Sequence, residues 1–380
     1  MHSASSEQEE LKTTPLFGEH EILGARIVPF AGYKMPVQYP GGIIAEHLAT
    51  RASAGLFDVS HMGQALLKGV DHATVAGFLE TLIPADILTL KPGKQRYSQL
   101  LNADGGILDD LMVSRSADPG QDGTLTLVVN AATKEADFAH ISAHLPAGIT
   151  LERKESWALV ALQGPKAEAV LADLGADVAA MGFMSVAVCT VGGIAARISR
   201  SGYTGEDGFE LSVADGDVVA LWRRLLADDR VRPVGLGARD SLRLEAGLCL
   251  YGHDIDTRTT PVEADLLWSI QKRRRESGGF PGAAVVQRQI RDGVERLRVG
   301  ILPEGRVPAR DGTEILAPDG TPLGVITSGG FGPSVNGPVA MGYIKKSHAT
   351  PGAAVRLMVR GKPVEARVAA MPFVPHAYKR

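Results

Sequence analysis

The chain has 380 residues, of which 40 are Lys or Arg and 43 are Asp or Glu, so its formal net charge at pH 7 is −3. Hydrophobic residues make up 44% and charged residues 22% of the sequence, which is typical of a folded globular protein and not of a disordered or fibrous one. The near balance of charge does not indicate a nucleic-acid partner, and no apolar run reaches the roughly 18 residues that a membrane span needs. Cys189 and Cys249 are far apart in the sequence and belong to no CxxC or Cys/His cluster, so neither a disulfide framework nor a zinc or other metal site is predicted.

The N-terminal region is predicted to be a tail followed by two helices. Residues 1–12 contain three glutamates and lack the basic or apolar stretches of a targeting signal, so we expect a disordered tail and a cytoplasmic protein. Residues 42–54 have helical spacing of apolar side chains and end at Gly55, a residue suited to a helix C-cap. Residues 56–67 are expected to be extended, and Asp71 is a predicted N-cap of a second helix that reaches about residue 82.

A hairpin and a third strand are expected next. Residues 97–102 and 107–115 are predicted strands, and the turn between them contains Asp104-Gly105, a favourable turn pair. Another strand is expected over 124–129, and Asn130 leads from it into an amphipathic helix. Together these elements predict a compact unit of hairpins and helices from about residue 56 to 145.

The second half of the chain changes character near residue 294. Residues 157–164 are predicted to be a strand and 166–174 a helix, and the same alternation over 198–226 predicts a second unit within 151–289. Beyond it the helical periodicity ends, and β segments such as 324–327 and 355–359 alternate with predicted turns at 311–312, 319–320, 329–330 and 361. This pattern predicts a small antiparallel barrel or sandwich.

Two adjacent carboxylates, Asp109 and Asp110, occur within a predicted strand. Strand alternation places them on opposite faces, so at least one of them enters an apolar surface. A buried carboxylate is costly unless something binds it, so the pair is either a shielded acid that acts on a ligand or a cap for backbone amides near the turn. The opposite orientations argue against joint binding of one metal ion by the adjacent pair.

Three other polar residues have an ordinary structural explanation beside a functional one. Glu210, on a predicted strand, is more often a solvated residue than a ligand-binding one. Arg239, at the start of a predicted helix, is expected to be a surface charge or part of an ion pair. Asn130 is more often a helix N-cap than a ligand-binding residue.

Several further residues also favour a structural interpretation. Tyr97 and Tyr378 are more often packing residues, and His61 has no spaced His or Cys partner, which favours a core or hydrogen-bonding histidine. The basic run 272–275 is typical of a solvated helix end that can also steer an acidic partner. The sequence contains no dinucleotide fingerprint, phosphate-binding loop or nucleophile elbow.

Six segments, in their order along the chain, resemble the aminomethyltransferase family, the T-proteins of the glycine cleavage system. The resemblance extends from Thr14 to Pro375 and therefore covers nearly all of the chain outside the tail. The segments are FDVSHM at 57–62, GGILDDL at 105–111, VVNA at 128–131, LQGP at 162–165, YTGEDGFE at 203–210 and GARDSLR at 237–243.

The resemblance implies an α+β fold of three domains in a cloverleaf-like arrangement around a central folate site, with a C-terminal antiparallel β-barrel. We therefore expect a folate-site domain or domains over 13–55 and 146–290. They would be interleaved with a hairpin-and-helix domain over 56–145 that carries Asp110, and the barrel would occupy 291–380.

The family resemblance also implies a reaction and a set of site residues. The donor is an aminomethyl group on the dihydrolipoyl arm of the lipoylated H-protein, and tetrahydrofolate accepts the carbon as ammonia leaves. Asp110 matches the catalytic aspartate, which would hydrogen-bond the folate and organise the attacking nitrogen and its proton. The residues implied in folate binding are Tyr97, Asn130, Tyr203, Glu210, Arg239 and Tyr378.

Related folate proteins supply two alternative functions. One is a folate-dependent demethylase of a methylated amine or sulfur compound, and the other is a non-catalytic folate-binding protein of iron-sulfur maintenance. The flavin-linked demethylases usually carry a fused oxidase. This chain has neither the length nor the dinucleotide-binding motif that an oxidase would need. The iron-sulfur proteins carry a Lys-Gly-Cys-Tyr motif that this sequence lacks. Aminomethyl transfer is therefore the first expectation.

Overall fold

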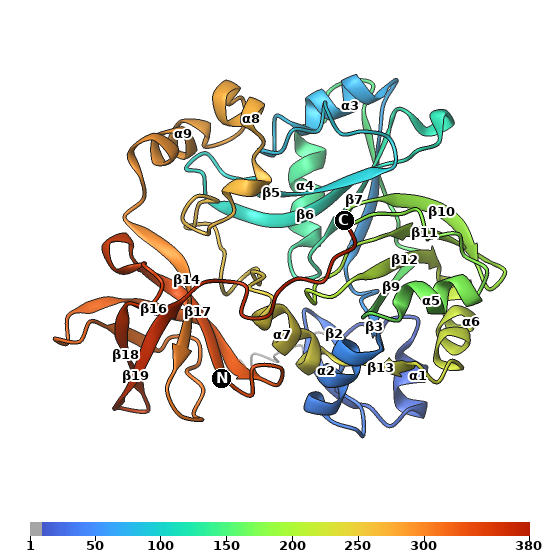
Figure 1. The fold of residues 1–380 in the computed structure, drawn as a ribbon. Helices are drawn as coiled ribbons and strands as arrows, with labels where there is room; N and C mark the ends of the chain where they lie inside the picture. The colour runs from blue at the N-terminus through green and yellow to red at the C-terminus, as the bar shows by residue number, and fades with distance from the viewer. Residues whose placement is uncertain (1–9) are drawn as a thin grey trace, which may run out of the picture.

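The computed structural model describes residues 10–380 and has a mixed α+β fold with three lobes: a six-stranded sheet, a five-stranded sheet and a barrel (Figure 1). Residues 1–9 of the expected tail at 1–12 lie outside the described residues. Lys12, at the end of the expected tail, forms a β-bridge with Tyr33. Within residues 10–380 no helix is long and apolar enough to cross a membrane.

The first lobe is built on a mixed six-stranded sheet whose strands come from distant parts of the chain. Its order is β10 (Val186–Val191), β11 (Ile194–Ser199), β12 (Gly208–Ala214), β9 (Trp157–Gln163), β3 (Ala54–Asp58) and β13 (Val231–Pro233). The helices α5 (Ala167–Asp173) and α6 (Asp215–Leu226) bury their apolar sides against it, and the fully buried Trp222 of α6 lies in this core.

An N-terminal segment packs beside this sheet. It contains α1 (Phe17–Ile22), the hairpin of β1 (Arg26–Phe30) and β2 (Tyr33–Gln38), and α2 (Ile43–Ala52). The helix expected over 42–54 is therefore present with slightly shorter bounds.

The second lobe is a five-stranded antiparallel sheet. Its order is β5 (Lys94–Leu101), β6 (Ile107–Arg115), β7 (Thr124–Val129), β4 (Gly63–Lys68) and β8 (Thr150–Arg153), with the short helix η1 (Pro119–Gln121) before β7. The helices α3 (His72–Leu79) and α4 (Lys134–Ala143) contribute to its core. Asp71 caps α3 as predicted, because its side chain accepts a hydrogen bond from the Thr74 N–H at 2.8 Å. The lobe thus spans 63–153, since β3 belongs to the other sheet and β8 extends it beyond the expected 56–145.

The chain between the sheets and the barrel combines short helices with long irregular segments. It contains α7 (Leu236–Glu245), η2 (Leu267–Ser269), α8 (Lys272–Ser277) and α9 (Ala283–Asp292). In Figure 1, α7 lies centrally between the barrel and the first lobe, whereas α8 and α9 lie against the second lobe.

The third lobe is a closed six-stranded barrel, as the sequence predicts for this end of the chain. Its order is β14 (Arg296–Pro303), β17 (Gly337–Lys345), β16 (Pro322–Gly332), β15 (Glu314–Leu316), β18 (Ala354–Val359) and β19 (Lys362–Ala369), with η3 (Lys346–His348) after β17. Residues 329–330 are not the expected turn, since they lie inside β16 and pair with Ala340 and Val339 of β17.

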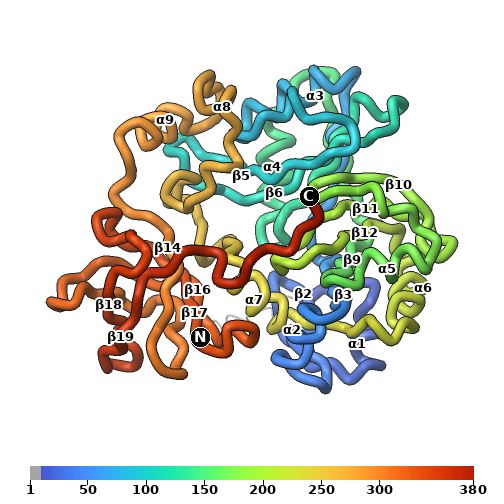
Figure 2. Tube along the Cα trace, in the orientation of Figure 1, coloured from blue at the N-terminus to red at the C-terminus, as the bar shows by residue number. Residues whose placement is uncertain are grey.

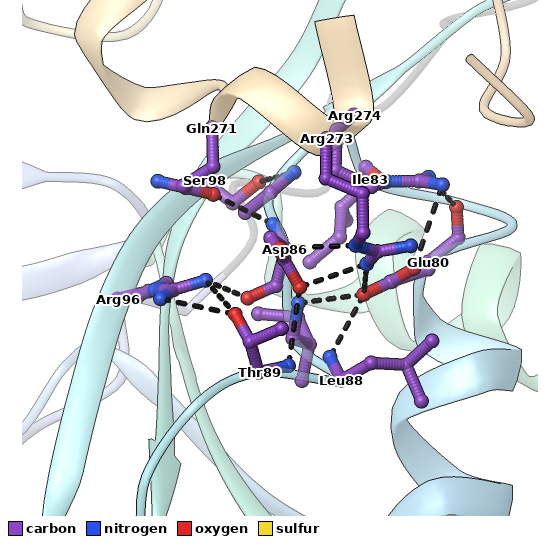
Figure 3. Close-up of polar contacts among 12 residues, drawn as sticks. Glu80, Ile83, Asp86, Leu88, Thr89, Arg96, Ser98, Gln271, Arg273 and Arg274 are labelled. Atoms are coloured by element: carbon purple, nitrogen blue, oxygen red, sulfur yellow. Dashed lines mark hydrogen bonds and ion pairs between the residues drawn. The ribbon is translucent and has the colours of Figure 1, made fainter. Parts of the chain in front are cut away.

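The basic run at 272–275 is not a solvated helix end. Arg273 and Arg274 point from α8 into the second lobe, where Arg273 contacts the carboxylates of Glu80 and Asp86 (Figure 3). Arg274 is 5% exposed and donates to the Gly278 carbonyl at 2.8 Å and to the Glu80 carbonyl. Only Lys272 of the run is strongly exposed, with 87% of its side chain accessible.

The C-terminal segment after the barrel crosses the molecule to the first lobe (Figure 2). Its contacts there are backbone hydrogen bonds from Ala377 to Gly205 and from Phe183 to Lys379, at 2.8 and 2.6 Å. The segment therefore connects the barrel to the six-stranded sheet.

Candidate active site

A cavity of about 370 Å³ lies between the two sheets. The five-stranded sheet contributes a polar face, since Gln64, Gln95, Ser114 and Thr126 all line the cavity. The cavity is closed on the other side by residues of the six-stranded sheet, among them Leu159, Arg197, Ser199, Glu210 and Ser212. Because polar side chains lie between the two sheets, the sheets enclose a pocket and not a continuous apolar core. Such a pocket is where a ligand is expected to bind.

On β6, Asp110 lies on the strand face that borders this cavity further along, without lining the cavity itself, and Asp109 lies on the opposite face. Asp110 shares its face with Met112, which lines the cavity, whereas Asp109 is fully buried on the face of the apolar core. The prediction that the two carboxylates point to opposite faces is therefore confirmed, and Asp109 is the one that enters the apolar surface.

Asn130 joins the two carboxylates at the end of the β6–β7 ladder. Because β7 ends at Val129, opposite Leu111, the next residue lies beside the two aspartates. The Asn130 side-chain amide donates to Asp109 Oδ1 at 2.9 Å and to Asp110 Oδ1 at 2.6 Å, and its backbone N–H donates to Asp109 Oδ2 at 3.0 Å. The N-cap explanation of Asn130 is wrong, because α4 begins after Thr133 and no side chain caps it.

Burial and charge both act on Asp110. Desolvation, followed by the negative charge of Asp109, raises the pKa of Asp110 to about 7, although hydrogen bonds from Tyr97 and Asn130 oppose the shift. Desolvation also raises the pKa of Asp109, against its hydrogen bonds from Asn130. A carboxyl group that titrates near neutral pH can both accept and return a proton.

Tyr97 of β5 pairs with Met112 of β6, so its side chain lies on the sheet face that carries Asp110. Burial, followed by the charge of Asp110, raises the pKa of Tyr97 well above its ordinary value, so the hydroxyl remains a donor at neutral pH. The Tyr97 ring stacks on Trp268, with 5.4 Å between ring centroids. Trp268 is 61% exposed, so this aromatic pair extends from the aspartate to the surface.

Glu210 of β12 faces the cavity and not the outer surface. Its Oε2 accepts a hydrogen bond from the Ser201 hydroxyl at 2.7 Å, and the residue is only partly exposed. The solvated-strand explanation of Glu210 is therefore wrong. One carboxylate oxygen engages Ser201, and the other has no hydrogen bond among residues 10–380.

Arg239 is placed over an aromatic ring. Its guanidinium carbon lies 4.7 Å from the ring centroid of Tyr203, and it forms no salt bridge among the described residues, contrary to the expected ion pair. Burial lowers the pKa of Arg239, and the charges of Tyr203 and Glu210 oppose this shift. The Tyr203 hydroxyl donates to the carbonyl of Cys249, which fixes the ring beneath the guanidinium.

His61 and Tyr378 have mainly packing contacts. His61 is 4% exposed and its Nδ1 has no hydrogen-bond partner among residues 10–380, so it is a core histidine. Tyr378 stacks on Phe183, with 4.0 Å between centroids, and no hydrogen bond joins it to the other expected site residues within the described chain. The structure thus brings Asp110, Asn130 and Tyr97 into one contact group and Arg239 and Tyr203 into another.

The sequence analysis missed Asp137 of α4, which forms a side-chain hydrogen bond with Asp109. A signal for it is present in the sequence. Asp137 precedes Ile141 by four residues, so the two share a helix face, and a carboxylate on an apolar face indicates a buried polar contact.

Comparison with known proteins covers nearly the whole chain. Residues 16–274 match the family model described as the GCVT N-terminal domain, and residues 296–375 match the glycine cleavage T-protein C-terminal barrel domain. The mitochondrial aminomethyltransferase of Dictyostelium discoideum is 42% identical over 99% of this chain and 95% of its own length. The mitochondrial aminomethyltransferase of Gallus gallus is 45% identical over 98% of this chain and 95% of its own length. A crystal structure of glycine cleavage system aminomethyltransferase T from Bartonella henselae matches with a TM-score of 0.91 and 45% identity, covering 97% of this chain and 100% of that chain.

Proposed function

Because the chain belongs to the glycine cleavage T-protein family, we propose that the group around Asp110 carries out the aminomethyl transfer typical of that family. The protein is an aminomethyltransferase of the glycine cleavage system. Its location in the cytoplasm stays a prediction from the sequence.

The reaction transfers one carbon between two substrates. The bond between the dihydrolipoyl sulfur and the methylene carbon breaks, the amino group leaves as ammonia, and two new bonds join the methylene to N5 and N10 of tetrahydrofolate. The two folate N–H protons leave with the sulfur and with the ammonia, so the products are a dihydrolipoyl thiol, ammonia and 5,10-methylenetetrahydrofolate. We propose lipoylated H-protein as the carrier and tetrahydrofolate as the acceptor substrate.

The observation that carries the proposal is the Asp110 carboxylate, held by Asn130 on the cavity face of β6. Its pKa near neutral pH lets it hold and release the proton of the attacking folate nitrogen. Because the group is partly shielded from water, its interaction with a developing positive charge on that nitrogen is stronger than it would be at the surface.

The remaining site residues fit a folate acceptor. The Glu210 oxygen without a partner can accept from the amino-pyrimidine edge of the pterin, which presents two donors. Tyr97 and Asn130 lie next to Asp110, and Tyr203 and Arg239 form the second contact group near Glu210. We also propose Tyr378 as a folate contact, by family resemblance alone.

The test is a turnover assay with purified protein, aminomethylated H-protein and tetrahydrofolate, in which ammonia and methylenetetrahydrofolate are measured. A matched reaction without folate and another with dimethylglycine as the methyl donor serve as controls. We expect ammonia release that depends on folate. Folate binding without ammonia release, or turnover of dimethylglycine, would contradict the proposal.

A further inference from the structure

Asp137 of α4 occupies an unusual environment for a carboxylate. It is 3% exposed, and its Oδ2 has no hydrogen-bond donor among residues 10–380. Because an anionic oxygen without a donor is strongly disfavoured in a protein interior, such a group is stable only in its protonated form.

The groups that face Asp137 are themselves acidic. Asp109 forms a side-chain hydrogen bond with it, and the charge of Asp110 acts on it from the same strand. Burial, and then the charges of Asp109 and Asp137, raise the pKa of Tyr251, after α7, to about 12, while Thr133 contacts Asp137 from the start of its own helix. In the described part of the chain no arginine or lysine forms a salt bridge with Asp109, Asp110 or Asp137. Burial, and then the charge of Asp109, raises the pKa of Asp137 to about 9.

Hydrogen bonds connect Asp109, the neighbour of Asp137, to the Asp110 carboxylate through Asn130. Asp109 accepts from the backbone and side chain of Asn130, and the Asn130 amide donates to Asp110 at 2.6 Å. Asp109 is fully buried and contacts no solvent, so its position is set by Asn130 on one side and by Asp137 on the other.

We propose that Asp137 is a positioning residue for the transfer reaction, because its protonated carboxyl donates to Asp109, which in turn holds Asn130 and the Asp110 carboxylate. This inference rests on the proposed function, since it assigns Asp137 a part in the same reaction. It adds a third aspartate, on a different element, to the pair on β6.

Removal of the donor has a predictable effect on the pH profile. In Asp137→Leu, Asp109 loses a hydrogen bond that favours its anionic form and takes up a proton. Asp110 then no longer faces a negative neighbour, so its pKa falls and the acid limb of the kcat profile moves to lower pH. We also expect kcat to fall on the order of 100-fold, because Asn130 and Asp110 lose their fixed geometry.

The isosteric variant Asp137→Asn separates positioning from simple packing. Its amide N–H can still donate to Asp109, so kcat and the acid limb should match those of the wild type. In the wild type, Asp137 should lose its proton at alkaline pH, where its pKa of about 9 lies, and activity should fall with it. The amide of the Asn variant does not ionise, so this alkaline loss should be absent. Glu135→Gln, which removes an exposed carboxylate from the same helix, is the control and should change neither limb.

A second measurement does not depend on turnover. The infrared spectrum of the wild type at neutral pH should contain a carbonyl band of a protonated carboxylic acid that Asp137→Asn lacks. This comparison remains available if Asp137→Leu does not fold.

The outcomes are distinct. Absence of folate-dependent turnover in the wild type would contradict the proposed function and leave the infrared result to decide the protonation of Asp137. An active wild type with no difference in the infrared band would overturn the inference. So would equal losses of kcat in the Asn and Leu variants, or an acid limb that does not move in Asp137→Leu.

Discussion

Asp110 owes its properties to two residues that approach it from different directions. Burial, and then the charge of Asp109, which precedes it on β6, raise its pKa, whereas Asn130, at the end of the neighbouring strand, donates a hydrogen bond that favours the anion. The balance places the pKa of Asp110 near 7, where a small change in either neighbour alters its charge at neutral pH.

Replacement of the catalytic carboxylate should separate binding from transfer. Asp110→Asn retains the shape of the side chain but cannot carry the charge or take up the proton, so we expect folate affinity to stay close to the wild-type value. The transfer rate should fall by about 100- to 10,000-fold. Isothermal titration and the ammonia assay measure the two quantities. The matched control is Asp104→Asn, an exposed carboxylate in the turn of the same hairpin, and normal turnover of Asp110→Asn would disprove the assigned role.

The same carboxylate predicts a pH dependence. If transfer needs the anionic form of Asp110, the rate should fall tenfold per pH unit below its pKa of about 7. Above that pKa it should level off, until the alkaline loss that we assign to Asp137 begins. A profile of kcat between about pH 5 and 9 covers the range in which such a group titrates. It therefore measures the loss of rate at low pH. The low residual activity of Asp110→Asn should lack the limb, and an identical limb in that variant would assign the titration to another group.

Glu210 should contribute to binding and not to chemistry. In Glu210→Ala the pterin edge loses charge-assisted hydrogen bonds of about 1.5–3 kcal/mol, so the folate Kd should rise by about 10- to 100-fold. The transfer rate at saturating folate should change little. Titration calorimetry measures Kd, and Asp217→Ala, an exposed carboxylate on α6, is the control. Unchanged affinity in Glu210→Ala would remove this residue from the folate site.

At the scale of elements, turn residues, cap residues and periodicity in the sequence predicted the structures that depend on neighbouring residues. The cap of α3 by Asp71, the hairpin of β5 and β6, and the β character of the last lobe all follow from turn and cap residues and from periodicity. The partners of distant residues could not be predicted in this way. Asn130 has the sequence features of an N-cap, yet it binds two aspartates about 20 residues earlier, because strand pairing brings those residues to its side. Residues 272–275 have the composition of a solvated helix end, yet Arg273 and Arg274 meet carboxylates that are nearly 200 residues away in the sequence.

The buried arginine of α8 should stabilise the contact between this helix and the second lobe. In Arg274→Met, the carbonyls of Glu80, Ile83 and Gly278 lose their donor, so we expect the free energy of unfolding to fall by about 3 kcal/mol. Chemical denaturation followed by circular dichroism measures the change. Lys272→Met, in the same run but with an exposed side chain, should change the stability by less than about 0.5 kcal/mol. Equal losses in the two variants would mean that the buried contacts do not contribute.

At the scale of the whole molecule, α7 connects the site to the barrel. Its first turn carries Arg239, and its last turn carries Arg243, which donates to Ser328 of β16 at 2.9 Å and to Asp254 at 2.8 Å. Asp254 is 1% exposed and also accepts from Thr327 and Ser328. The buried ion pair of Arg243 and Asp254, through its hydrogen bonds to Thr327 and Ser328, therefore links the helix that presents Arg239 to strand β16 of the barrel.

This ion pair predicts how the lobes depend on one another. Asp254→Ala removes the buried counter-charge of Arg243 and leaves it only the exposed Asp240, so we expect a loss of about 3–5 kcal/mol in the free energy of unfolding. Asp240→Ala removes the other carboxylate that contacts Arg243, but its side chain is 55% exposed and water replaces it, so the loss should stay near or below about 1 kcal/mol. Because α7 also carries Arg239, the folate Kd of Asp254→Ala should rise even where the protein is still folded. Differential scanning calorimetry and folate titration of the two variants measure these effects. A large loss of stability in Asp254→Ala with unchanged folate affinity would show that the barrel stabilises the fold without positioning the site.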